Sequence, residues 1–105
     1  MPVKDFNGRQ VEVDEEGYLV NQADWDEELA KAIAKEEGIG ELTEAHWKVI
    51  HFMRKEYQEK GTAPSIRRLK NTGGVPVKEL YRLFPGGPAK KAAKIAGLPK
   101  PQGCV

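Results

Sequence analysis

The chain has 105 residues, a formal net charge of +1 at pH 7, a single cysteine and no apolar run as long as a membrane span. This length supports one domain with a modest core, and one cysteine excludes a disulfide framework and a thiolate-rich metal site. No signal-peptide pattern opens the sequence, so we expect a cytoplasmic protein, in a reducing compartment where a thiol stays available.

The near-neutral total hides opposite charges in the two halves of the chain. Residues 1–53 carry 13 acidic and 5 basic side chains, a balance of −8, whereas residues 54–105 carry 3 acidic and 12 basic, a balance of +9. This asymmetry is able to steer an acidic partner toward the C-terminal half. It is equally consistent with two halves of one fold that attract each other, and the sequence leaves both interpretations open.

The N-terminal residues predict a β-hairpin. Residues 3–6 and 10–13 alternate apolar and polar side chains, and Asn7-Gly8 between them favours the positive φ angles of a tight hairpin turn. Residues 14–17 indicate a second turn, and Tyr18-Leu19-Val20 a short extended stretch.

The rest of the chain predicts about five helices. The first is capped by Asn21 or Asp24 and runs to about Glu37, and the second runs from an N-cap at Thr43 to Gly61. Three shorter helices are expected over residues 65–70, 76–84 and 88–96, with Pro64, Pro76 and Pro88 at their starts. We therefore expect a small, mainly α-helical bundle with an N-terminal β-hairpin, residues 1–96, followed by a C-terminal arm, residues 97–105.

The sequence contains no pattern typical of a self-contained enzyme. His46 and His51 are five residues apart, which places them about 140° apart around a helix rather than on one face as zinc ligands require. We predict both to be surface or partly buried side chains, and we predict no metal site and no cofactor. Gly86-Gly87-Pro88 lacks the lysine and threonine that end a phosphate-binding loop.

Residues 62–84 also resemble a helix-turn-helix. Two short helices carry basic residues, among them Arg67 and Arg82, and a glycine turn separates them. The second helix offers few side chains suited to base edges, because Leu80, Leu83 and Phe84 are expected in the core. A DNA-binding regulator is the alternative function that this pattern leaves open, although direct contact with nucleic acid is not our expectation.

The most informative feature is the tail Gly97-Leu98-Pro99-Lys100-Pro101-Gln102-Gly103-Cys104-Val105. Gly97 suits a helix C-terminus, and the two prolines prevent the helix from continuing and favour an extended backbone. Nine extended residues reach roughly 30 Å at about 3.3 Å each. The tail therefore either presents the Cys104 thiol to another macromolecule or is a frayed terminus with an incidental cysteine.

The tail and four further segments together resemble the DsrC/TusE/DsvC family of sulfur-relay proteins over nearly the whole length. The four segments are residues 14–19, 42–47, 63–67 and 83–90. The resemblance implies a helical bundle with an N-terminal hairpin, and a penultimate cysteine, here Cys104, that accepts persulfide sulfur and passes it on. It also implies donor and acceptor partners from a sulfur-relay complex or a dissimilatory sulfite reductase, with the chain acting as a sulfurtransferase-type co-substrate.

One departure from the family matters. Members that serve sulfite reductase have a second cysteine eleven residues before the penultimate one, and that position here is Ala93. TusE-type members, which supply sulfur for 2-thiolation of the tRNA wobble uridine, also lack it. The stretch from Lys70 to Leu80 is short, however, which is more typical of DsrC. The sequence does not choose between these pathways, nor between a natural Ala93 and a replaced cysteine.

The resemblance and the residue chemistry together suggest roles around Cys104. The Val105 carboxylate opposes thiolate formation, whereas Lys100, and Lys94 or Arg67 if the arm folds back, favour the anion. Leu98, Pro99 and Pro101 form the partner-binding stem, with prolines that reduce the ordering cost of insertion, and Gly103 lets the backbone pass a narrow channel.

Overall fold

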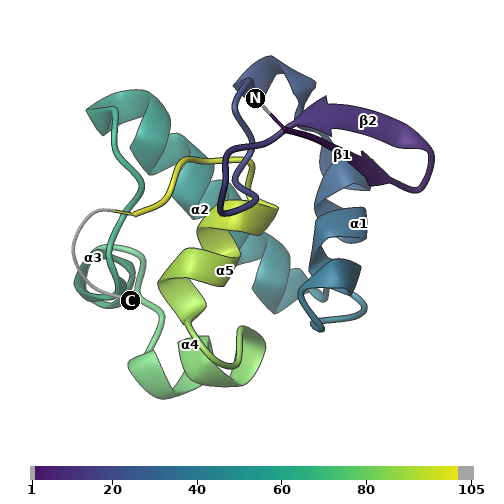
Figure 1. Ribbon diagram of the computed structural model, residues 1–105. Coiled ribbons are helices and arrows are strands. Elements are labelled where there is room, and N and C mark those ends of the chain that lie inside the picture. Colours follow the sequence, from purple (N-terminus) through teal and green to yellow (C-terminus); the bar gives the residue numbers. More distant parts are fainter. Residues whose placement is uncertain (1, 102–105) are drawn as a thin grey trace.

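The computed structural model of the chain describes residues 2–101, in which a two-stranded hairpin precedes five α-helices (Figure 1). The mainly helical fold with an N-terminal hairpin is therefore confirmed. The elements are β1 (Val3–Phe6), β2 (Arg9–Glu12), η1 (Gln22–Asp24, a 3-10 turn), α1 (Glu27–Glu36), α2 (Glu44–Lys60), α3 (Ile66–Asn71), α4 (Val77–Leu83) and α5 (Pro88–Ile95).

The hairpin forms for the reason that the sequence indicated. Asn7 and Gly8 have φ angles of 55° and 87°, as a tight two-residue turn requires, and Phe6 pairs with Arg9 at the last step of the antiparallel register. The second predicted turn is also present: the Asp14 carboxylate accepts the N–H groups of Glu16 and Tyr18, each at 2.9 Å. This turn is what positions Glu16 and Tyr18 beside the C-terminal segment.

The start of α1 differs from the prediction. Asn21 caps only the short turn η1, and α1 begins at Glu27, three residues beyond Asp24, with the carboxylate of its N-cap Asp26 accepting the Leu29 N–H at 2.8 Å. Trp25 between them is extended, with ψ near 139°. A tertiary contact explains the difference. Arg9 of the hairpin donates to the Asp24 carbonyl and to the Asp26 carboxylate, and these bonds keep Trp25 extended between η1 and α1.

The other helix ends lie within a residue or two of the predicted ones. Ser65 rather than Pro64 caps α3, and Pro76 is the residue before α4 rather than its first residue, whereas Pro88 does open α5.

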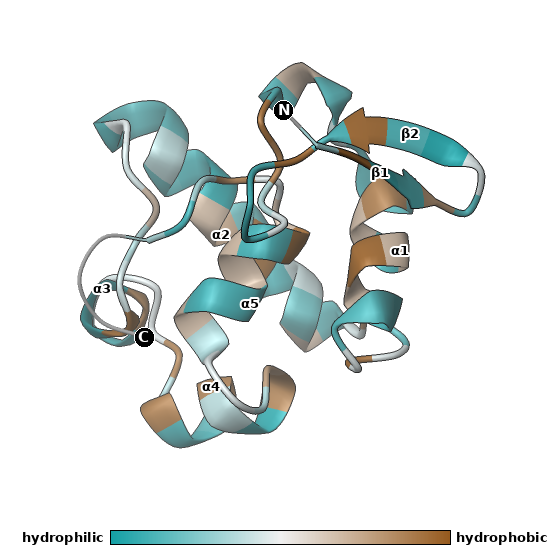
Figure 2. Ribbon diagram, viewed as in Figure 1, coloured by the Kyte–Doolittle hydropathy of each residue, from teal (hydrophilic) through white to brown (hydrophobic). Residues whose placement is uncertain are grey.

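α5 is the centre of the bundle, in contact with α1, α2 and α4 (Figure 1). Its buried side is made of small residues, because Ala89, Ala92 and Ala93 have no exposed surface. Polar and apolar residues alternate along α1 and α5, as expected for helices with one buried face (Figure 2). The C-terminal end of the central helix, and the residues that follow it, therefore start within the packed core.

Candidate functional site at the C-terminal segment

The end of α5 is closed by Gly97, as the sequence predicts. Gly97 has φ +73°, and its N–H donates to the Lys94 carbonyl at 3.2 Å, while the Leu98 N–H donates to the Ala93 carbonyl at 2.9 Å. This pair of bonds is a Schellman-type cap, which reverses the chain direction directly after the helix. The residues beyond Gly97 therefore leave α5 in a defined direction.

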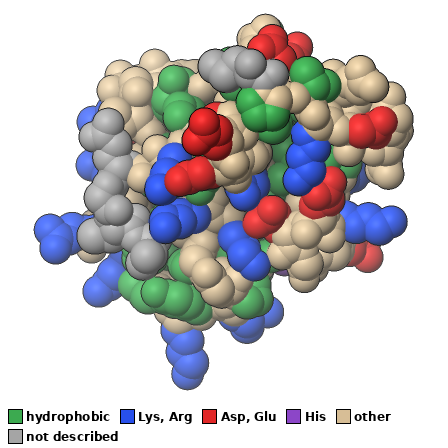
Figure 3. Space-filling model, viewed as in Figure 1, with side chains coloured by type: hydrophobic (Ala, Val, Ile, Leu, Met, Phe, Trp, Pro, Cys, Tyr) green, Lys and Arg blue, Asp and Glu red, His purple; other side chains and the backbone are tan. Residues whose placement is uncertain are grey.

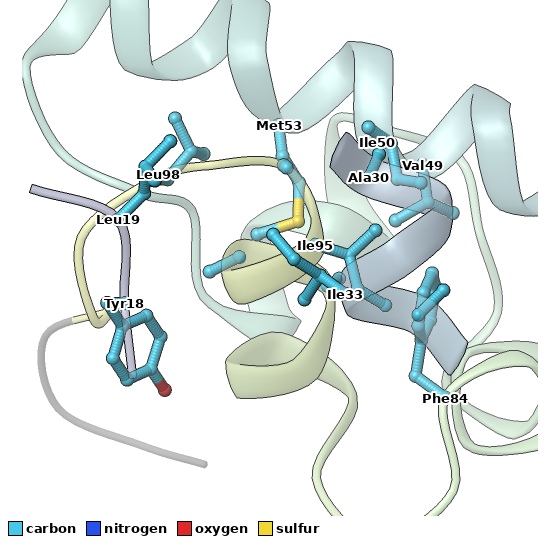
Figure 4. Packing of buried hydrophobic residues seen from close by; sticks show 14 of the residues in the cluster. Tyr18, Leu19, Ala30, Ile33, Val49, Ile50, Met53, Phe84, Ile95 and Leu98 are labelled. Carbon is cyan, nitrogen blue, oxygen red and sulfur yellow. The ribbon is translucent and has the colours of Figure 1, made fainter. Parts of the chain in front are cut away.

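Leu98 lies inside the protein rather than on a solvent-exposed stem. Its side chain has no exposed surface and belongs to the same hydrophobic cluster as Leu19, Met53 and Ile95 (Figure 4). In this conformation the Leu98 side chain is not available to a partner, and it attaches the start of the segment to the core.

Two side chains that the sequence did not single out for function contact the same helix end. The Trp25 Nε1–H donates to the Ile95 carbonyl at 2.8 Å, and Arg54 donates to the Ala96 carbonyl at 2.8 Å. The Arg54 guanidinium also lies 3.9 Å from the centre of the Trp25 ring. No sequence signal marks this arrangement, because the partners are 70 and 42 residues apart.

The segment then runs along the molecular surface. Pro99 and Lys100 are exposed, and Pro101 is buried. Lys100 Nζ lies 3.1 Å from a Glu16 carboxylate oxygen, and both side chains are about half exposed. The described part of the segment is thus held at Leu98, at Lys100 and at Pro101.

A pocket of about 300 Å³ lies beside this segment. Four lysines and two glutamates contribute to its lining, which consists of Glu16, Tyr18, Glu37, Gly86, Gly87, Lys90, Lys91, Lys94 and Lys100. Lys94 is paired with Glu37 at 3.6 Å, and Lys91 donates to the Glu37 carbonyl at 3.2 Å. Basic and acidic side chains are interspersed across this face (Figure 3).

The lysines outnumber the carboxylates in this pocket, so its lining carries a net positive charge. Tyr18 forms part of the wall, and burial, together with the nearby carboxylates of Glu16, Asp14 and Glu37, raises its pKa to about 12. The Tyr18 hydroxyl therefore stays protonated at neutral pH and acts as a neutral hydrogen-bonding group.

The predicted site residues are only partly brought together. Lys94 and Lys100 line one pocket, whereas Arg67 lies exposed on α3 and does not contribute to it. Gly103 and Cys104 lie outside the described residues. Lys90 and Lys91 were missed as site residues, although three lysines at positions 90, 91 and 94 on one short helix were a visible signal.

The pair of helices α3 and α4 has the predicted succession of short helices, but two of its basic side chains are engaged within the fold. Arg68 donates to Glu56 at 2.6 Å, and this hydrogen bond holds the pKa of the buried Glu56 carboxyl below its usual range. Arg82 is paired with Glu79 on α4 itself, and Leu80 and Leu83 are buried in the core. These contacts account for Arg68 and Arg82 without nucleic acid.

The two histidines have structural surroundings. His51 is exposed and stacks on Trp47, with ring centres 5.7 Å apart. His46 is buried, beyond the partial burial that we expected: its Nδ1 accepts the Thr43 N–H at 3.1 Å, which leaves Nε2 to donate to the Leu83 carbonyl at 2.9 Å. His46 therefore caps α2 and ties it to α4.

The fold and the site define a class of small helical proteins with an N-terminal hairpin and a C-terminal segment docked beside a lysine-rich pocket. Within that class, the chain matches the family of DsrC-like proteins over residues 5–105 and belongs to this family. The resemblance stated from the sequence is thereby confirmed.

Relatives of both branches of the family align over nearly the whole chain. Sulfurtransferase TusE of Yersinia pseudotuberculosis is 50% identical, covering 96% of this chain and 99% of the relative. The dissimilatory-type sulfite reductase subunit gamma of Nitratidesulfovibrio vulgaris is 44% identical, covering 95% of each chain. The alignment with the TusE protein extends over 108 residues, more than the 105 of this chain, so that relative contains inserted residues.

A solved structure supports the same assignment. The oxidized gamma-subunit of the dissimilatory sulfite reductase (DsrC) from Archaeoglobus fulgidus superimposes with a TM-score of 0.79 at 41% identity, covering 99% of this chain and all of that chain. None of these three relatives is named as a DNA-binding protein, and the DNA-binding alternative finds no support here.

Two further observations concern residues 2–101. No helix in this range has the length and apolar character needed to cross a bilayer. Within the same range, no group of three or more acidic or histidine side chains is arranged to hold a metal ion.

Proposed function

We propose that this chain is a sulfur carrier that accepts persulfide sulfur at Cys104 and passes it to a partner protein. The observation that carries the proposal is the placement of the chain's single thiol. It stands second from the end of a segment that is anchored at Leu98 and runs beside a lysine-rich pocket, in a chain of the DsrC-like family. We place this chemistry in the reducing cytoplasm, where the thiol is not consumed in a structural disulfide.

The proposed step is a thiol exchange without net oxidation. The Cys104 thiolate attacks the outer sulfur of a donor persulfide, the donor S–S bond breaks, and the donor leaves as a thiolate. Cys104 then carries the outer sulfur as a persulfide, whose terminal sulfur is attacked in turn by an acceptor thiolate. No cofactor is needed, because bond formation and bond breakage balance at each step.

The described residues provide an environment that suits an anionic sulfur. Lys100 is four residues from Cys104 and lines the pocket together with Lys94. Four residues reach roughly 13 Å at about 3.3 Å each. We therefore propose that the sulfur anion rests near these lysines between transfers, where opposite charge favours the thiolate and the persulfide anion. Arg67 remains a candidate contact for a partner rather than for this resting position.

The anchored residues limit how far the sulfur travels. With Leu98 in the core, six residues lead to Cys104, which is roughly 20 Å at about 3.3 Å each. This reach is shorter than the 30 Å expected for the entire tail. We propose that the moving arm begins at Pro99, that its release breaks the Lys100–Glu16 pair, and that Pro99, Pro101 and Gly103 shape its entry into a partner.

Ala93 bears on the choice of partner. It has no exposed surface and its carbonyl belongs to the cap of α5. A chain with Ala93 has no second thiol with which to form an internal disulfide, so we propose sulfur transfer to a relay partner rather than the oxidised cycle of a two-cysteine protein.

The test substitutes this chain for each of two relatives, TusE and the sulfite reductase gamma subunit, in the system where that relative works. In a Yersinia strain without TusE, the chain should restore 2-thiolated tRNA, and Cys104→Ala should not. In a second arm, the chain replaces the gamma subunit in an assay of sulfide formation by the Nitratidesulfovibrio sulfite reductase. We expect weak activity there that Ala93→Cys raises. Failure of the chain in both arms, with normal folding by circular dichroism, contradicts the proposal.

A further inference from the structure

We propose that Trp25 and Arg54 are positioning residues for the carrier segment: together they fix the end of α5 from which the segment leaves the body. This proposal rests on the function proposed above, because the starting point of the segment matters only if Cys104 must be delivered to a partner. The geometry of the two side chains is independent of that function.

The C-terminal end of α5 needs hydrogen-bond donors from outside the helix. The last carbonyls of a helix lack partners within the helix. The cap at Gly97 and Leu98 satisfies two of them, at Ala93 and Lys94. The next two, at Ile95 and Ala96, receive their donors from Trp25 and Arg54, both at 2.8 Å. The helix end is thus completed by two elements that are distant in the sequence.

Arg54 is a partly buried charged residue. Burial lowers the pKa of its guanidinium, which shows that its charge is held at some cost. Among residues 2–101 no carboxylate forms a salt bridge with it. Its interactions are instead with the Trp25 ring, 3.9 Å away, and with the Ala96 carbonyl. Within residues 2–101, the hydrogen bond and the ring contact of this partly buried arginine both lie at the base of the segment.

Trp25 fits closely against Gly97, the residue at which the chain reverses. A Cβ atom added to Gly97 would lie 2.4 Å from Trp25 Cδ1 and 2.8 Å from Trp25 Cγ, so the indole packs directly against the glycine backbone. Trp25 thus contacts the residue at which the chain reverses, and the Arg54 guanidinium lies over the Trp25 ring. We call Trp25, Arg54 and Gly97 the pivot clamp.

The pivot clamp determines which region the Cys104 sulfur can reach. With the pivot clamp closed, the tether from Leu98 to Cys104 has a fixed origin and a length of at most roughly 20 Å. When the last turn of α5 frays, the origin shifts and the tether lengthens, so the sulfur spends less time in any one place. The effective concentration of the sulfur at a partner site falls as the accessible volume grows.

The single cysteine allows a direct test in the full-length chain. A nitroxide is attached at Cys104, and the broadening of backbone amide signals by NMR maps the surface that the label visits. The variants are Arg54→Met, which retains the aliphatic stem but removes the donors, and Arg54→Lys, which retains the charge and one donor. Val75→Ala, a buried residue in the loop before α4, serves as a control of similar destabilisation remote from the pivot.

We expect broadening in the native chain to concentrate on amides around the lysine-rich pocket. In Arg54→Met the broadening should be spread more evenly over the surface, with less contrast between the pocket amides and amides elsewhere, such as those of the hairpin turn at Asn7-Gly8, and with partial return to the native pattern in Arg54→Lys. Val75→Ala should match the native chain. The same broadening in Arg54→Met as in the native chain would overturn the clamp, and because this readout requires no sulfur transfer, its failure is distinct from failure of the carrier function.

Discussion

Gly97 combines a backbone requirement with a packing requirement at one residue. Its φ of +73° favours glycine, and the Trp25 indole occupies the position that a Cβ atom would take. Gly38, which follows α1, has a similar φ of +80°, but nothing lies within 4 Å of its Cβ position. The two glycines therefore separate the backbone effect from the packing effect.

Alanine at these two glycines should have unequal effects. Gly38→Ala is expected to lower the free energy of unfolding by about 1 kcal/mol, the usual cost of the left-handed conformation for alanine. Gly97→Ala should cost at least about 1 kcal/mol more, because the methyl group must also displace Trp25. Urea unfolding followed by circular dichroism measures both. Equal losses in the two variants would contradict the packing described at the pivot.

The buried Glu56 carboxylate makes the stability of the fold depend on pH. Its folded-state pKa is lowered, first by the hydrogen bond from Arg68, so the ionised pair stabilises the fold above the unfolded-state pKa of about 4.5. That stabilisation is lost as the pH falls through the lower folded-state pKa. Glu56→Gln should therefore reduce stability at pH 7, by about 1–3 kcal/mol, and should flatten the acid dependence of the unfolding midpoint. A native-like acid dependence in Glu56→Gln would contradict this account.

At the scale of the elements, the start of α1 shows what sequence patterns capture and what they do not. The hairpin, the two turns, and the ends of α2 and α5 were predictable, because Asn7-Gly8, Thr43, Gly61 and Pro88 act through local backbone preferences. The interruption at Trp25 was not predictable, since it depends on Arg9 reaching across from the hairpin. The burial of Leu98 was not predictable for a related reason: burial by the rest of the chain leaves no local mark in the sequence.

The cap of α1 gives a matched pair of variants. Asp26→Ala removes the acceptor of the Leu29 N–H and one partner of Arg9, so we expect a melting temperature lower by roughly 4–8 °C. Asp24→Ala leaves the backbone carbonyl that Arg9 contacts and should change the melting temperature much less. Thermal unfolding followed by circular dichroism compares them. A larger drop in melting temperature for Asp24→Ala would contradict the cap at Asp26 and favour Asp24, which the sequence predicted as a cap.

At the scale of the whole molecule, the opposite charges of the two halves meet inside one fold. The acidic half contributes Glu16 and Glu37, and the basic half contributes Lys100 and Lys94, in two ion pairs on either side of the pocket. Lys94 and Glu37 are each about one-fifth exposed, whereas the pair at Lys100 is about half exposed. The more exposed pair belongs to the carrier segment, so it is the one that salt or a partner disrupts most readily.

Loss of the Glu16 carboxylate should increase the reactivity of Cys104, because it leaves the Lys100 ammonium free to favour the thiolate. Exposed ion pairs contribute up to about 1 kcal/mol, so Glu16→Gln should raise the alkylation rate of Cys104 by iodoacetamide about twofold to fivefold at low salt. High salt should bring the native chain close to the variant. The neighbouring Glu15→Gln is the control and should react like the native chain. Equal rates in the native chain and in Glu16→Gln at low salt would contradict a docked segment.

The central claim is that Cys104 carries sulfane sulfur, and intact mass spectrometry tests it most directly. The chain is incubated with a cysteine desulfurase and isotope-labelled cysteine, separated from the donor and weighed, with Yersinia TusE under the same conditions as the reference. We predict a gain of one labelled sulfur atom that is absent from Cys104→Ala. No gain in the native chain while TusE is loaded, or an equal gain in Cys104→Ala, would contradict the claim.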